Sequence, residues 1–287
     1  MAAVCWGAGD FCGGIAARLG GALVAAFTAQ VVGLLLALGL LALAQEPTPP
    51  TAALALAALG GALGALGVGC FYLALSRGTM GLVAPLTALL AATIPALTGL
   101  ARGDEVVPLV LVGMITALAA VVLISMPDRR LGSPIMPSDH GSRAREWLLI
   151  VGAGLGFGGF FLLIDASHDA GGAVWWPLFM VKSGGLAAVV VAAVVMVPLG
   201  RRPVIILGSA VLLLGCLAGV GDLAGNLFFV LASGEGELSV VVVLSSLYPL
   251  STALLARVFL HERLGPLRLA GVALALTGVV LIGLGSL

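Results

Sequence analysis

The chain has 287 residues, of which 61% are hydrophobic and 9% are charged. A water-soluble domain carries about 25% charged residues to cover its surface, so this composition excludes a soluble fold and indicates an integral protein of the lipid bilayer. The 13 basic and 13 acidic residues balance. The net charge of zero therefore says nothing about a partner, and we expect no binding of nucleic acid.

Hydrophobic segments of helical length follow one another along the whole chain, separated by short breaks of Gly, Pro and charged residues. Because lipid offers the backbone no hydrogen-bond partner, each segment must be a helix or a strand of a closed barrel. The alternation that marks barrel strands is not seen. The first segment lacks a basic n-region and a cleavage site, so we expect it to remain in the mature protein. The sequence predicts an all-α integral membrane protein with ten transmembrane helices, at 3–18, 20–44, 52–75, 79–101, 105–126, 147–167, 172–198, 204–232, 238–260 and 265–286.

The polar segment 127–146 divides the predicted helices into two groups of five. An offset of 157 residues superposes the two groups, and the matched pairs include Gly64 with Gly221, Ser76 with Ser233 and Glu105 with Glu262. A second offset, of 151 residues, pairs Gly20 with Gly171. An odd number of helices per half gives the copies opposite orientations, as in the inverted repeats of secondary transporters. We therefore predict two five-helix repeats, 1–126 and 147–287, joined by the linker 127–146.

Two corresponding stretches also resemble a known family. They are 72–105 (YLALSRGTMGLVAPLTALLAATIPALTGLARGDE) and 229–263 (FVLASGEGELSVVVVLSSLYPLSTALLARVFLHER). With the Gly-rich closing segment LAGVALALTGVVLIGLG, they resemble the paired repeats of the EamA-type drug/metabolite transporter superfamily. The resemblance covers essentially the whole chain, although the first repeat has prolines at Pro85 and Pro95 whereas the second has Pro249. It implies a ten-helix carrier of the cytoplasmic (inner) membrane and leaves the cargo open.

Polar residues inside the predicted helices are the candidate site residues, because an Asp or Lys at the centre of a membrane helix costs about 2.5–3.5 kcal/mol. Asp222 and Asn226 lie four residues apart in one predicted helix, and Phe229 follows one turn later. One helix face therefore carries an acid, an amide and an aromatic ring. We predict a substrate or proton site there; the alternative is a polar clasp between packed helices.

Lys182 is the only lysine and lies in the predicted helix 172–198 on one face with Trp175 and Phe179. Near an interface it would snorkel toward water; facing inward it would bind an anionic group or pair with Asp222. Gln30 neighbours the position that matches Lys182 in the first repeat, and it joins the candidates as the lone amide of its predicted helix.

Asp10, Tyr72 and Tyr248 complete the set of candidates. Asp10 is, in addition to Asp222, a candidate to bind the coupling ion if its side chain lines a cavity. The alternative is that Asp10 lies at the membrane interface, because it is close to the chain start. Tyr72 and Tyr248 offer hydroxyls either to a substrate or to hydrogen bonds between helices. Trp175 is also consistent with an aromatic belt at the membrane surface.

No motif for enzymatic chemistry is found: the chain has no HExxH, no GxSxG and no P-loop, so we predict that it is not an enzyme. The cysteines (Cys5, Cys12, Cys70 and Cys216) all fall inside predicted helices without CxxC or Cys/His spacing. They are typical of apolar core positions rather than of disulfides or metal ligands, and no metal or cofactor is predicted.

The sequence thus predicts a multi-pass carrier that moves a small metabolite or drug-like solute by alternating access, with proton coupling or exchange as its energy source. A scaffold of the same fold, or a channel, is the alternative. Orientation stays open, because ten of the 13 basic residues lie in odd-numbered loops. That distribution favours termini outside the cytoplasm, whereas the family resemblance implies termini inside it.

Overall fold

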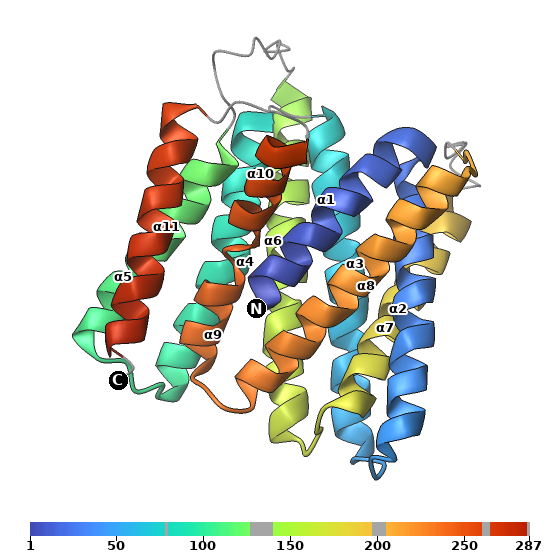
Figure 1. Ribbon diagram of the computed structural model, residues 1–287, viewed down its shortest axis with the longest axis horizontal. Helices are drawn as coiled ribbons and strands as arrows, with labels where there is room; N and C mark the ends of the chain where they lie inside the picture. The colour runs from blue at the N-terminus through green and yellow to red at the C-terminus, as the bar shows by residue number, and fades with distance from the viewer. Residues whose placement is uncertain (78–79, 127–139, 197–204, 260–264, 286–287) are drawn as a thin grey trace. The chain divides into compact units, whose positions relative to one another are not determined.

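The computed structural model describes residues 1–77, 80–126, 140–196, 205–259 and 265–285. Every regular element in these ranges is a helix (Figure 1). The helices are α1 (Ala2–Gly20), α2 (Ala22–Ala44), α3 (Thr51–Arg77), α4 (Met80–Arg102), α5 (Pro108–Ser125), α6 (His140–Asp169), α7 (Trp175–Met196), α8 (Ser209–Ser233), α9 (Leu238–Ser245), α10 (Tyr248–Phe259) and α11 (Pro266–Gly285).

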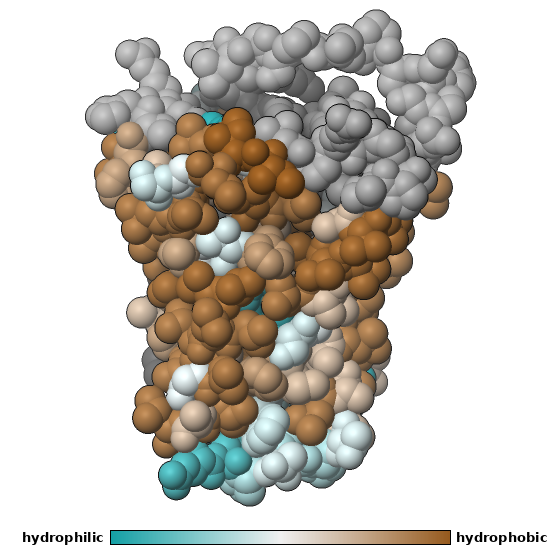
Figure 2. Space-filling view, turned by 90° about the vertical axis from the view of Figure 1, so that its right-hand side faces the viewer, coloured by the Kyte–Doolittle hydropathy of each residue, from teal (hydrophilic) through white to brown (hydrophobic). Residues whose placement is uncertain are grey.

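Eight segments of the described chain are long and apolar enough to cross a bilayer. They lie in α2, α3, α5, α6, α7, α8, the consecutive pair α9–α10, and α11. Large hydrophobic side chains such as Leu43 and Leu213 are exposed, and hydrophobic residues cover most of the face drawn in Figure 2. The chain is therefore a multi-pass α-helical membrane protein. The predicted spans 3–18 and 79–101 coincide with α1 and α4, which fall outside this set of eight, so the count of ten stays a prediction.

The predicted helix 238–260 is interrupted, which the hydropathy pattern did not predict. It consists of α9 and α10, separated at Ser246 and Leu247. Pro249 has no N–H to donate, and its ring clashes with a carbonyl one turn earlier, so a continuous helix is disfavoured here. The Ser246 hydroxyl donates to the Val242 carbonyl at 2.7 Å and helps to end α9.

The helices form two compact units, and each unit takes helices from both halves of the sequence. Unit 1 comprises Met1–Leu66 and Phe160–Glu235, and unit 2 comprises Gly67–Gly159 and Gly236–Leu287. The boundaries fall within α3 and α6. Neither unit coincides with a predicted repeat. The repeats are predicted from matching sequence positions and not from contacts in space, so they remain a prediction. Residues 127–139 of the predicted linker lie outside the described residues, and α6 already begins at His140.

In unit 1, α1 packs against α8, and α2 packs against both α7 and α8 (Figure 1). The backbones of α3 and α7 approach so closely that a Cβ atom on Gly61 would collide with the Val181 backbone, and one on Gly184 would collide with that of Ala58. Small residues at such crossings are typical of membrane helices, which gain no hydrophobic driving force from lipid.

In unit 2, α5 and α11 lie side by side along their whole length, and α4 packs against α9 (Figure 1). Gly285 lies next to Val110, and Gly271 lies next to Ile124, so α5 and α11 run antiparallel. The turn between α4 and α5 contains Gly103 with a φ of 108°, a conformation that favours glycine.

Candidate functional site

An ion pair joins α7 to α8 in unit 1. The Lys182 ammonium donates a hydrogen bond to the Asp222 carboxylate. The Lys182 side chain is 1% exposed, whereas the Asp222 side chain is 38% exposed. A charge inside a membrane helix is costly unless it is paired, so the pairing explains how Lys182 can be buried. The structure confirms that Lys182 faces inward and pairs with Asp222, one of the alternatives that the sequence left open.

Helix α2 provides the surface along which Lys182 lies. A Cβ atom on Gly33 would lie 3.0 Å from Lys182 Cδ and 3.2 Å from its Cε, so the lysine stem occupies the space that this glycine leaves. Gln30 lies one turn earlier on α2, and its side chain fills the space beside Gly185 of α7. Among the described residues, no group donates a hydrogen bond to the buried Gln30 Oε1.

Asn226 and Phe229 continue the site along α8, and both contact Trp6 of α1. The Trp6 Nε1–H donates to Asn226 Oδ1 at 3.0 Å, and the Trp6 and Phe229 rings lie 5.9 Å apart. Phe160 and Phe161 of α6 join the same aromatic cluster, with the Phe161 and Phe229 rings 4.8 Å apart. No sequence pattern predicts these partners, because residues 220 positions apart meet only through packing.

Asp10 belongs to the same site because α1 crosses α8 at Gly9. A Cβ atom on Gly9 would lie 3.1 Å from the Asp222 backbone nitrogen, and one on Gly221 would lie 2.8 Å from the Gly9 Cα. The charges of the Asp10 and Asp222 carboxylates are close enough to repel each other. The site thus contains two carboxylates and one ammonium, with Asp10 itself exposed.

Trp175 lies away from this group, at the start of α7 and about two helical turns before Lys182. There the Glu46 carboxylate accepts the backbone N–H groups of Val174, Trp175 and Trp176 at 2.9, 3.0 and 2.9 Å. No local sequence signal marks Glu46 as the cap of α7, because the loop that carries it is remote in sequence from that helix. Phe179, one turn before Lys182, has its ring 6.2 Å from that of Trp176.

The two tyrosine candidates belong to unit 2 and are not part of the unit 1 group. Tyr72 lies in α3, and its side chain is outside the described residues. Tyr248 is the first residue of α10, directly after the interruption that follows α9. Their proposed contacts with a substrate stay a prediction.

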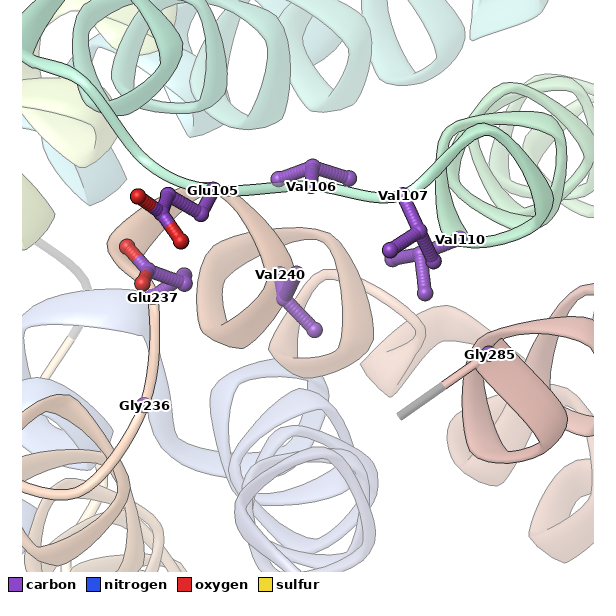
Figure 3. Close-up of a pocket in the computed structure, with 8 residues that line it drawn as sticks. All are labelled: Glu105, Val106, Val107, Val110, Gly236, Glu237, Val240 and Gly285. Atoms are coloured by element: carbon purple, nitrogen blue, oxygen red, sulfur yellow. The ribbon is translucent and has the colours of Figure 1, made fainter. Parts of the chain in front are cut away.

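Unit 2 contains a pocket of about 290 Å³ between the α4–α5 turn and the start of α9. Its lining includes Glu105 and Glu237, whose carboxylates point toward one another in Figure 3, and valines from α5 and α9. Next to it, Asp104 Oδ2 accepts the Ser239 backbone N–H at 2.8 Å and so caps α9. Within the described residues, no group of three His, Cys, Asp or Glu side chains is arranged to hold a metal ion.

No family model and no curated protein match the chain. Solved structures do match it. One of them, described only as "Crystal structure of protein", aligns with a TM-score of 0.70 at 20% sequence identity, covering 98% of this chain and 95% of that one. At this level of identity the likeness shows a shared fold alone.

Proposed function

We propose that the protein is a secondary transporter of the EamA type, which moves a small solute across the cytoplasmic membrane by alternating access. The observation that carries this proposal is the ion pair between the buried Lys182 and Asp222, with Asp10 as a neighbour, carried by the apolar helices α7, α8 and α1. Ionisable residues are expensive in a membrane and typically mark substrate or proton pathways. Two carboxylates with one ammonium leave one carboxylate free to exchange a proton or to bind a cationic group.

The buried amide and ring cluster beside the ion pair supports a solute site rather than an ion-only path. Asn226 is 4% exposed and Phe229 is 0% exposed, and the Trp6 indole fixes the Asn226 amide. Apolar walls with a few convergent polar groups are typical of small-molecule sites. The absence of a recognisable ATP motif in the sequence leaves ion coupling, exchange or facilitated diffusion to drive transport.

The packing also supports the proposed ten-helix architecture with two inverted repeats. Gly221 of α8 contacts Gly9 of α1, and Gly64 of α3 contacts Phe160 of α6. The offset of 157 residues relates Gly64 to Gly221, and the offset of 151 residues relates Gly9 to Phe160. The Gly64–Phe160 contact therefore corresponds to the Gly221–Gly9 contact. The proposed equivalents α5 and α11 run antiparallel, as copies of opposite orientation require.

Flux measurements in proteoliposomes test the proposal. We expect Asp222→Asn to abolish accumulation of solute driven by a pH gradient, because the amide cannot titrate. Exchange of labelled solute across the membrane persists, because exchange returns the carrier without releasing the proton. Asp169→Asn, at the exposed end of α6, is the matched control and should behave as the wild type. The transporter proposal fails if a broad solute screen detects no flux with the wild type; a scaffold of the same fold would give that result.

A further inference from the structure

The Gln30 side chain has an unused acceptor in the middle of a membrane-spanning helix. Its Oε1 atom is buried, and no described group donates a hydrogen bond to it. Gln30 lies in the span Ala22–Ala44, which contains no charged residue. A buried polar atom without a partner destabilises the state in which it is left unpaired. This cost is explained if Gln30 gains a partner in another state of the protein.

The geometry of the α2–α7 crossing indicates which partner that is. Gly33 and Gln30 are three residues apart and share one face of α2, and Lys182 and Gly185 share one face of α7. The Lys182 stem lies over Gly33, with a Cβ atom there 3.6 Å from Lys182 Nζ, while the Gln30 amide lies over Gly185. Each long side chain therefore occupies the space left by a glycine of the other helix, and the two side chains are neighbours.

We propose that Gln30 is the second acceptor for the Lys182 ammonium, which donates to Asp222 in the state described here and to Gln30 Oε1 when Asp222 is engaged otherwise. An ammonium has three N–H donors and no acceptor. When Asp222 takes up a proton or a cationic solute, its oxygens no longer offer Lys182 an unshared negative charge, and a second acceptor then compensates part of that loss. Lys182 pairs with Asp222 of α8, and Asp222 in turn interacts with Asp10 of α1. On α2 the Thr28 side chain lies against Gly215 of α8, whereas the Gln30 amide lies at the α7 crossing beside Lys182, which makes Gln30 a positioning residue. The link to a transport cycle rests on the proposed function.

Melting temperatures of the purified protein test the inference without any transport assay. In the wild type, Gln30→Leu should leave the melting temperature unchanged or raise it, because it removes an unpaired buried oxygen. In the Asp222→Asn background, which mimics a protonated Asp222, the same change should lower it by about 2–4 °C, because the uncharged amide at position 222 holds the Lys182 ammonium less strongly and the Gln30 acceptor is then lost as well. Thr28→Val is the matched control on α2, since Thr28 contacts Gly215 of α8, and its effect should be the same in both backgrounds.

A rescue variant gives the opposite sign. Gln30→Glu in the Asp222→Asn background supplies a carboxylate on α2, so we expect it to restore the melting temperature that Asp222→Asn loses. Asp222→Ala serves as the second background if Asp222→Asn cannot be purified. The inference is overturned if Gln30→Leu has the same effect in both backgrounds, or if Gln30→Glu gives no rescue. A wild type without flux would refute the transporter proposal and leave these melting results standing.

Discussion

Lys182 and Asp222, the two partners of the ion pair, differ in burial. Removing one of them should therefore destabilise the protein more than removing the other. Asp222→Ala leaves the Lys182 ammonium, 1% exposed, without its carboxylate. Breaking a buried pair in this way costs about 3–5 kcal/mol, and we expect about 3 kcal/mol because Gln30 can accept one hydrogen bond. Lys182→Met keeps the volume of the side chain approximately unchanged and leaves the Asp222 carboxylate without its ammonium partner. The Asp222 side chain is 38% exposed, so water can hydrate it. Its cost should be near that of an exposed pair, about 1 kcal/mol.

Thermal unfolding of the purified variants in one detergent measures this difference. At about 2–4 °C per kcal/mol, Asp222→Ala should lower the melting temperature by about 6–12 °C and Lys182→Met by about 2–4 °C. The double variant removes both charges and should melt closer to the wild type than Asp222→Ala does, because no uncompensated charge remains. Equal losses for the two single variants, or a double variant that shows the sum of both losses, would refute the reasoning.

Three further predictions concern contacts that the structure adds. Trp6→Phe removes the indole donor to buried Asn226 and should cost about 1–3 kcal/mol in unfolding free energy, measured by denaturation. Glu46→Gln should cost about 1 kcal/mol and raise amide hydrogen exchange at the start of α7, because a charged cap favours a helix N-terminus; unchanged exchange there would contradict the assigned role. Burial and the Asp104 carboxyl raise the pKa of Glu237 above its ordinary value of 4.5. The protonated Glu237 side chain therefore stabilises the fold fully below about pH 4.5, and this stabilisation is lost as the pH rises through the raised pKa. Glu237→Gln should therefore flatten the decline of melting temperature with pH, whereas Glu235→Gln should not.

The sequence by itself determined where the helices lie and that the protein is embedded in a membrane. These properties follow from the local run of apolar residues, because a backbone in lipid must satisfy its hydrogen bonds within the segment. The bounds of α2 and α8 therefore lie close to the predicted ranges 20–44 and 204–232. The same reasoning singled out Lys182 and Asp222, since a charge within such a run is conspicuous whatever the fold.

Only the tertiary structure decided which of these residues meet. Lys182 and Asp222 are 40 positions apart, and Trp6 and Asn226 are 220 positions apart, so no local pattern relates them. Pairing depends on which helix faces cross, and glycines such as Gly33 set those crossings without any hydropathy signal of their own. The same applies to the two compact units, each of which combines both halves of the chain, because helix packing in a membrane depends on fit between surfaces rather than on order along the sequence.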